Sequence, residues 1–164
     1  MYPCFDIDGI STESLLREWK WLAPGEFSLV AVNAFGDLFL QDGRGIVNRL
    51  DLTSGKISTV ASSAADFRNA ANDASKKRDW FLEELAKQAE RSGCSPGKGQ
   101  CVGGKVPFVF AQSANAPDNL YVADLYEYVS FMGDLHRQMK DVPDGGQTRI
   151  IVQPHPVQSH PREK

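Results

Sequence analysis

The chain has 164 residues, of which 41% are hydrophobic and 24% charged, a composition that suits one folded domain rather than a disordered chain. Its 21 acidic and 18 basic residues give a formal net charge of -3, which does not favour a nucleic-acid binder that neutralises phosphates. The sign instead suits a partner protein with a basic surface.

The N-terminal residues include neither the basic nor the apolar segment of a secretory signal, and no apolar run approaches the roughly 20 residues that cross a bilayer. The three cysteines, Cys4, Cys94 and Cys101, are an odd number, so at least one thiol stays free or pairs between chains. We therefore expect a cytoplasmic protein with reduced thiols and no membrane partner.

The first part of the chain predicts a short helix followed by an antiparallel meander. Residues 11–22 begin with N-cap candidates and place Leu15, Leu16 and Trp19 on one helical face. Runs rich in β-forming residues follow, and connections as short as DGRG at 42–45 cannot make parallel crossovers. The predicted strands span residues 27–35, 37–42, 46–52 and 56–61.

Two longer helical regions are predicted after the meander. Ser63-Ala-Ala-Asp66 has the form of a capping box and opens a region that runs to about Ser92, with a break near Ser75 and Gly93 as the C-cap. In the second region, apolar residues recur at steps of three and four, which predicts an amphipathic helix. These residues are Leu125, Tyr128, Val129, Met132, Leu135 and Met139.

The remaining segments complete the predicted fold. Between the helical regions, residues 94–105 are a predicted loop and residues 106–112 a predicted strand, and a last strand is predicted at 148–153. The order of these elements predicts one α+β domain, residues 1–152, with helices packed on a mainly antiparallel β-meander sheet. The proline-rich residues 153–164 are a predicted disordered tail.

The stretch GQCVGGKV at 99–106 nearly matches the phosphate-binding pattern G-x-x-x-x-G-K-[ST], with Val106 in place of the hydroxyl residue. That pattern requires a strand before the glycines and a helix after them, whereas here a helix is predicted before and a strand after. Pro107 also removes a backbone donor close to the cradle. We therefore expect no nucleotide or other cofactor at this loop.

The cysteines and the first aspartates carry weak indications of a metal site. Cys94 and Cys101 lack the C-x-x-C or H-x-x-x-H spacing of structural zinc sites, and in a reducing compartment they are expected to be small apolar side chains rather than a disulfide. Asp6 and Asp8 could bind a divalent cation, but such a pair is more often an exposed acidic turn.

Asp134, His136 and Arg137 could suggest a catalytic group, but charged side chains near the end of a helix are mostly solvated or structural. The chain contains no G-x-S-x-G pattern, which would place a nucleophile on a sharp turn. The sequence therefore predicts no catalytic residue, no metal site and no enzymatic activity.

Tyr126 is a candidate protein-binding residue. It lies off the apolar stripe of its helix and is flanked by Asp124 and Glu127, and a tyrosine with an acidic rim suits a protein–protein interface. The alternative is that Tyr126 packs against the neighbouring strand.

Three stretches together resemble a known family. They are AFGDLFLQDGRGIVNRLDLTSGKI at 34–57, GQCVGGKVPFVFA at 99–111 and SFMGDLHRQMKDVPDG at 130–145. In this order and spacing they resemble the C-terminal domain of type VI secretion system immunity proteins, which is often joined to GAD-like domains and is similar to the SUKH-like toxin-neutralising group. The resemblance covers residues 15–150. The chain departs from the family in lacking a GAD-like domain and in having Val-Gly-Gly before Lys105, where an aromatic residue is expected.

The resemblance implies an immunity protein that has no cofactor and binds a cognate effector toxin, such as a nuclease, so as to occlude its active site. The motif residues are expected to shape the fold, with Gly36 and Asp37 in a hairpin and Lys105 and Pro107 at the entry to a strand. A basic nuclease groove is a suitable target for carboxylates. The candidate toxin-binding residues are Asp37, Asp42, Asp51, Asp118, Asp124, Tyr126 and Glu127.

Two alternative functions remain open. The first is a generic protein-interaction or regulatory domain of the same fold without a toxin partner. The second is a small enzyme or nucleotide binder that uses residues 99–106. Fold alone does not decide between these functions.

Overall fold

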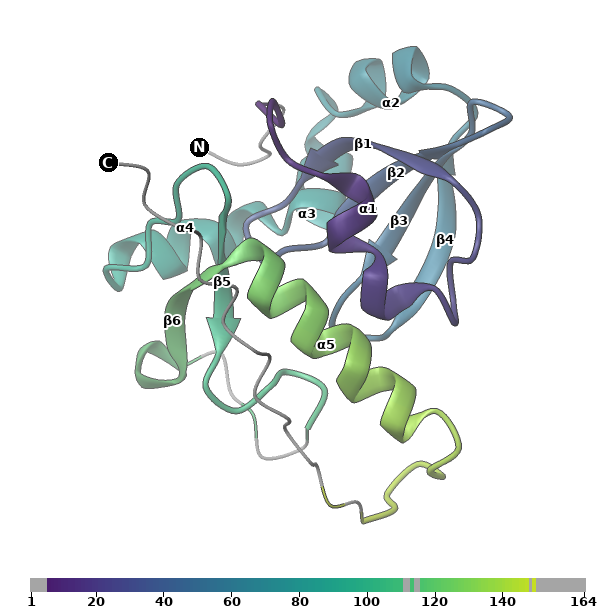
Figure 1. Ribbon diagram of the computed structural model, residues 1–164. Coiled ribbons are helices and arrows are strands. Elements are labelled where there is room, and N and C mark those ends of the chain that lie inside the picture. The colour runs from purple at the N-terminus through teal and green to yellow at the C-terminus, as the bar shows by residue number, and fades with distance from the viewer. Residues whose placement is uncertain (1–5, 111–112, 114–115, 148, 150–164) are drawn as a thin grey trace, which may run out of the picture.

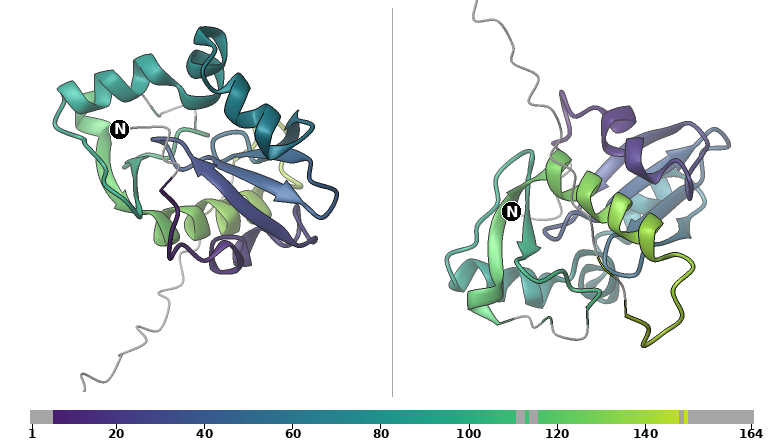
Figure 2. Two further views of the ribbon diagram at one scale, coloured as in Figure 1. Left: turned by 90° about the horizontal axis from the view of Figure 1, so that it is seen from above. Right: turned by 60° about the horizontal axis from the view of Figure 1, so that its bottom comes forward.

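The computed structural model describes residues 6–110, 113, 116–147 and 149 (Figure 1). The predicted tail, the end of the predicted domain and all but one residue of the predicted strand at 148–153 lie outside these residues, as does Cys4. The described part is a single α+β domain in which helices pack on a four-stranded antiparallel meander, as predicted. The helices cover both faces of the sheet (Figure 2).

The main sheet follows the order of the sequence, because short turns join neighbouring antiparallel strands. A register shift between Leu29 and Ala31 lets Leu29 face one side of the sheet while Val30 and Ala31 both pack on the other. The sheet therefore contributes to two separate cores. Its strands are β1 (Phe27–Val32), β2 (Leu38–Asp42), β3 (Val47–Asp51) and β4 (Lys56–Ala61).

One face of the sheet is covered by both ends of the described chain. The predicted helix at 11–22 forms as α1 (Thr12–Leu15), capped by the Ser11 hydroxyl, followed by the 3₁₀ helix η1 (Arg17–Trp19). The predicted long helix is α5 (Leu125–Met139), whose apolar stripe is buried as predicted except for the half-buried Met139. These elements share one core cluster with the sheet.

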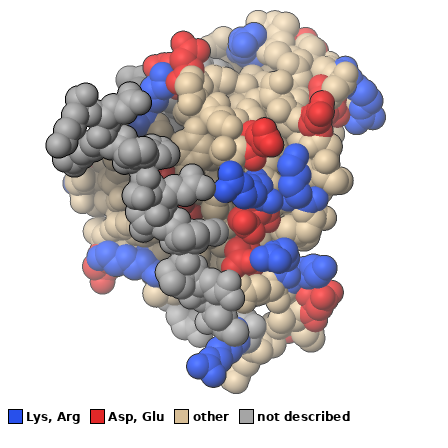
Figure 3. Space-filling view, viewed as in Figure 1, with Lys and Arg blue, Asp and Glu red and all other residues tan. Residues whose placement is uncertain are grey.

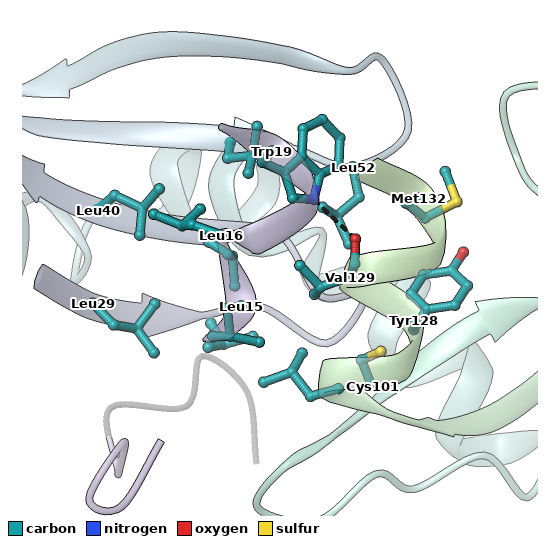
Figure 4. Close-up of a cluster of buried hydrophobic side chains, with 14 of the residues drawn as sticks. Leu15, Leu16, Trp19, Leu29, Leu40, Leu52, Cys101, Tyr128, Val129 and Met132 are labelled. Atoms are coloured by element: carbon teal, nitrogen blue, oxygen red, sulfur yellow. Dashed lines mark hydrogen bonds between the residues drawn. The ribbon is translucent and has the colours of Figure 1, made fainter. Parts of the chain in front are cut away.

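Trp19 joins the two ends within this core. Its side chain is completely buried, and its Nε1–H donates a hydrogen bond of 2.9 Å to the carbonyl oxygen of Val129 in α5 (Figure 4). A buried indole N–H needs such a partner, since an unpaired donor costs roughly 1–3 kcal/mol. Leu15 and Leu16, also buried, flank Trp19 as the sequence predicts.

The other face of the sheet packs against α2 (Ala64–Ala70) and α3 (Ala74–Phe81). The Ser63 hydroxyl caps α2 by accepting from the Asp66 N–H, as predicted. The break predicted near Ser75 lies two residues earlier, where Asp73 caps α3. The second core is rich in aromatic rings, namely Phe39, Phe67, Trp80 and Phe81.

The last helix of this region is α4 (Glu83–Arg91). It is separated from α3 by Leu82, whose left-handed backbone, with a φ of 52°, interrupts the helix. This break was not predicted. Gly93 ends α4 as predicted: its N–H donates to the Glu90 carbonyl, and the Cys94 N–H donates to the Ala89 carbonyl.

The segment between α4 and α5 differs from the prediction. Strand β5 (Gln100–Gly104) lies inside the predicted loop, and the short 3₁₀ helix η2 (Pro117–Asn119) leads into a second strand, β6 (Leu120–Asp124), that was not predicted. The strand predicted at 106–112 is wrong over its described residues, which form a turn. There the Val106 N–H donates to the Asn119 side chain, and Pro107 has no N–H to donate.

No helix within the described residues combines the length and the apolar character that crossing a bilayer requires.

Candidate functional site

Strands β5 and β6 form a two-stranded antiparallel ribbon beside the main sheet (Figure 1). A Cβ atom on Gly103 would lie 2.8 Å from Tyr128 and 2.9 Å from Tyr121, so this glycine makes room for two tyrosine rings. The stretch GQCVGGKV therefore forms a strand packed under aromatic side chains. It does not have the strand–loop–helix arrangement that a phosphate cradle requires.

The two tyrosines meet edge to face, with ring centroids 6.4 Å apart and planes at 82°. Tyr128 is 4% exposed and Tyr121 is 39% exposed. Burial raises the pKa of both phenols above their ordinary value, so both stay neutral near pH 7. Tyr121 thus presents a neutral aromatic ring at the surface.

The exposed large apolar side chains of the described residues all lie in or next to this ribbon. They are Val106, just beyond β5, at 39% exposure, and Tyr121 and Val122, in β6, at 39% and 37%. Because successive side chains of a strand point to opposite faces, Tyr121 and Val122 give β6 exposed apolar surface on both faces. The two β6 residues border a hollow of about 280 Å³, which is lined by Tyr121, Val122, Ala123, Asp124, Glu127, Tyr128 and Phe131.

Three of the predicted toxin-binding acids lie at the two ends of β6. Asp118 is exposed before the strand, and Asp124 and Glu127 are exposed at its other end. Asp124 also has a structural role, because its Oδ1 accepts from the Glu127 N–H and caps α5. At the Asp118 end, Lys105 donates its ammonium to the Asp118 carbonyl at 2.6 Å. We call Val106, Asp118, Tyr121, Val122, Asp124 and Glu127 the ribbon surface.

Tyr126 is not part of the ribbon surface. Its hydroxyl accepts a hydrogen bond of 2.7 Å from the Ser11 N–H, and its half-buried ring packs on the core shared by the two ends of the chain. The contacts of Tyr126 therefore favour the alternative role, which is packing and not recognition. Tyr126 packs on the N-terminal segment, whereas the alternative had placed it against a strand.

The prediction that Asp37 contacts a partner is wrong, because Asp37 is 2% exposed. Its carboxylate accepts hydrogen bonds from the Arg49 guanidinium, the Asn33 amide at 2.9 Å and the Leu52 N–H at 2.9 Å. Burial raises the pKa of Asp37 and the Arg49 charge opposes the rise. Because each of these groups donates, only the ionised carboxylate satisfies them all. Asp37 therefore shapes the hairpin, as its motif suggested.

Asp42 and Asp51 lie at turns of the main sheet and not beside the ribbon surface. One oxygen of Asp42 accepts from the Arg44 and Ile46 N–H groups at 2.9 and 3.1 Å. One oxygen of Asp51 accepts from two N–H groups of its own turn at 2.9 and 3.0 Å. Such contacts stabilise turns, and these carboxylates border other hollows of the surface.

The cysteines and the histidine of the described residues are buried in the protein interior. Cys94 and Cys101 are free and buried, and burial raises the pKa of the Cys101 thiol far above its ordinary value. His136 is 7% exposed, and its Nε2 lies 2.8 Å from the Leu52 carbonyl. Within the described ranges, no group of three His, Cys, Asp or Glu side chains could hold a metal ion.

The charged candidates on the surface pair with opposite charges. Asp6 lies 2.8 Å from the Lys98 ammonium, while Arg137 contacts both Asp134 and Glu18. Figure 3 shows that basic and acidic side chains alternate along the face that carries α5. The ribbon surface differs from that face, since it combines exposed apolar side chains with three acids, of which Asp118 has Lys105 beside it.

The signal for this surface was present in the sequence. The run Leu-Tyr-Val at 120–122 is rich in β-forming residues and follows the turn residues Pro-Asp-Asn, a pattern that predicts a strand. No protein-family model matches the chain, and no curated protein matches it. The resemblance to type VI immunity proteins therefore stays a prediction.

Proposed function

We propose that this protein is an immunity protein that binds a cognate type VI effector toxin through the ribbon surface and occludes the toxin's active site. The observation that supports this most is that Tyr121 and Val122 are exposed in β6 between Asp118 at one end of the strand and Asp124 and Glu127 at the other, with the exposed Val106 at the Asp118 end. Aromatic and aliphatic side chains with a charged rim are the usual composition of a protein-binding patch.

The charge of this surface suits the proposed partner. A nuclease groove is basic because it holds phosphates, and carboxylates placed opposite such a groove speed association and select the partner. Asp118, Asp124 and Glu127 are available for this role, and the net charge of the chain, -3, has the same sign. Inhibition by occlusion needs no chemistry from the immunity protein itself.

Co-expression tests the proposal. The protein encoded by the neighbouring gene is expressed in a host with and without this chain, and growth is measured. We expect growth arrest that this chain relieves, and a complex that co-purifies. A neighbouring protein that is harmless, or that stays toxic beside this chain, refutes the immunity function. A stable complex with a harmless partner favours the alternative of a generic interaction domain.

A pair of neutral substitutions locates the surface. Asp124→Asn with Glu127→Gln removes two charges, and asparagine at 124 still caps α5, which lysine would not do. We expect toxin affinity to fall at least about tenfold, or roughly 1.4 kcal/mol. The matched control is Glu13→Gln with Glu26→Gln, two exposed acids that border a different hollow. Equal affinity losses in both variants would place the binding surface elsewhere.

A further inference from the structure

Strand β6 is paired on one side only within the described residues, since its sheet has two strands. The bonds to β5 recur every second residue in an antiparallel pair. At the ends of the ribbon, the Lys105 N–H donates to the Asn119 carbonyl at 2.8 Å, and the Leu125 N–H donates to the Gly99 carbonyl at 2.9 Å. Tyr121 and Ala123 lie two residues inward from Asn119 and Leu125, so they also direct their backbone groups towards β5.

The alternate residues of β6, Leu120, Val122 and Asp124, direct their backbone groups away from β5. Strand β5 shows the same alternation: Val102, which pairs with Val122, donates its N–H away from β6 to the Ala34 carbonyl at 2.7 Å. On β6, the Leu120 N–H bonds to the Pro117 carbonyl, and the Asp124 carbonyl enters the first turn of α5. Four groups then face outward: the Leu120 carbonyl, the Val122 N–H and carbonyl, and the Asp124 N–H.

These four groups alternate acceptor, donor, acceptor and donor along one edge, which is the pattern that an added strand pairs with. Beside the edge, Val122 is 37% exposed and the hollow of about 280 Å³ can take side chains. Asp118, with Lys105 beside it, lies at one end of the edge, and Asp124 and Glu127, which carry more negative charge, lie at the other. An occupant with an apolar centre and a basic residue near each end matches this arrangement.

We infer that an extended segment of the partner protein, apolar in its centre and carrying Lys or Arg at both ends, adds to β6 as a third strand of the ribbon. This inference rests on the proposed function, since it names how the ribbon surface takes the toxin. Main-chain hydrogen bonds along β6 supply affinity, and the terminal acids select a basic segment.

The charges argue against a second copy of this chain as the occupant. Antiparallel pairing of two β6 strands about Val122 brings Asp118 of each copy, with Lys105 beside it, to the end where Asp124 and Glu127 of the other copy lie, so that acids outnumber bases among these groups at both ends. Like charges brought together in this way are destabilising. A basic partner segment meets opposite charges at both ends instead.

The inference is tested by measuring hydrogen–deuterium exchange of single backbone amides by NMR in the full chain labelled with ¹⁵N. The probe is the peptide Ac-Lys-Val-Thr-Val-Lys-NH₂, and the controls are its Glu-ended counterpart and a copy N-methylated on alternate backbone nitrogens. We expect the Lys-ended peptide to slow exchange of the Val122 and Asp124 amides at least about tenfold, because they become hydrogen-bonded. The Tyr121 and Ala123 amides, already bonded to β5, should change little. Neither control should slow exchange.

Unchanged exchange at Val122 with millimolar Lys-ended peptide overturns the inference, as does equal slowing by the N-methylated copy. Slowing that grows with protein concentration and needs no peptide would identify a second copy as the occupant and also overturn it. Because this experiment contains no toxin, its failure refutes strand addition alone. Failure of the co-expression test refutes the immunity function and removes the toxin as the partner, but it leaves the result with the peptide unchanged.

A backbone variant gives an independent test. Val122→Pro removes the outward N–H and leaves the β5 bonds of Tyr121 and Ala123 in place, and proline is tolerated at such edge positions. The matched control Val122→Thr keeps the N–H. We expect peptide affinity to fall at least about tenfold in the proline variant and less than about threefold in the threonine variant. Equal affinity in both variants, with both folded by circular dichroism, contradicts strand addition.

Discussion

Arg49 donates two hydrogen bonds to one oxygen of the buried Asp37, from Nη2 at 2.6 Å and from Nε at 3.1 Å. Its remaining Nη1 donates to the carbonyl of Asp79 in α3 at 2.8 Å. A single guanidinium thus connects β3, the hairpin before β2 and a helix on the second face of the sheet. The connection depends on a carboxylate that is almost entirely removed from water.

Replacing Arg49 by methionine should destabilise the protein strongly, because Asp37 then stays buried without its counter-charge. Removing one partner of a buried ion pair lowers the free energy of unfolding by about 3–5 kcal/mol. Urea denaturation monitored by tryptophan fluorescence measures this loss. Arg44→Met is the control, since Arg44 is 77% exposed in its pair with Asp42 and should change stability little. Similar losses in both variants would contradict the role given to burial.

His136 should make the protein less stable in mild acid. Burial lowers the pKa of His136 below the ordinary 6.5, and the Leu52 carbonyl only partly opposes this. As pH falls below 6.5, the unfolded chain takes up the proton before the folded chain does, so stability is full above that pH and is lost towards the folded pKa. The slope is at most about 1.4 kcal/mol per pH unit for one proton.

The test compares the wild type with His136→Gln, which keeps a donor for the Leu52 carbonyl and cannot titrate. Unfolding free energies measured between pH 7.5 and pH 5 (roughly the span in which a histidine of this kind titrates) should decline more steeply in the wild type. Parallel curves would show that another group causes the acid sensitivity.

Gly55 should not tolerate alanine. A Cβ atom there would lie 2.4 Å from Nδ1 of His136, and the backbone φ is +64°. We expect Gly55→Ala to cost about 1–3 kcal/mol from the steric conflict, in addition to the roughly 1–2 kcal/mol of a left-handed backbone. Gly99→Ala is the matched control, because Gly99 has a φ of +74° and open space around its Cβ position. Thermal unfolding of the two variants should therefore separate the two contributions, and equal losses would exclude a conflict with His136.

ATP with magnesium should not stabilise this protein. The Gly103 position that a phosphate would approach lies under Tyr121 and Tyr128, and the Lys105 ammonium is bound to the Asp118 carbonyl. A ligand at 100 times its dissociation constant stabilises the folded state by about 2.7 kcal/mol, which a thermal-shift measurement detects. A nucleotide-dependent rise in Tm that Lys105→Gln abolishes would restore the nucleotide-binding alternative.

The elements predicted best are those whose signals are local. Ser11 and Ser63 cap helices with their own hydroxyls, and Gly93 ends α4 with a left-handed backbone. The period of α5 holds over four turns, so its buried face follows from sequence spacing alone. The meander follows in the same way, because its connections are too short for any other topology.

The elements predicted worst depend on contacts made from a distance. Residues 106–110 have the composition of a strand, but the side chain of Asn119 takes the Val106 N–H that a strand would have used. β6 was hidden because Asp124 is both its last residue and the N-cap of α5, so no turn separates the two elements. No local pattern contains the contact from Asn119, whereas the strand pattern of β6 was present in the sequence and was missed because the helix follows it directly.

The candidate site was predicted only in part, because the burial of some of its residues depends on contacts with distant parts of the chain. Asp118, Asp124 and Glu127 are exposed as expected, since carboxylates are rarely buried. Asp37 was the exception, because its burial depends on Arg49, which is 12 residues away and approaches only when β2 and β3 pair. The exposed Tyr121 and Val122 were missed together with the strand that carries them.

The hydrogen bond between Trp19 and Val129 spans 110 residues, so it has a consequence for synthesis of the chain. The aromatic core on the far side of the sheet uses residues 30–81 and can consolidate while the ribosome is still adding later ones. The core under Trp19 cannot close until α5 has emerged, so the leucines at its N-terminal side remain exposed to water for most of translation. Trp19 can therefore make this hydrogen bond only late in synthesis, although it lies among the first residues made.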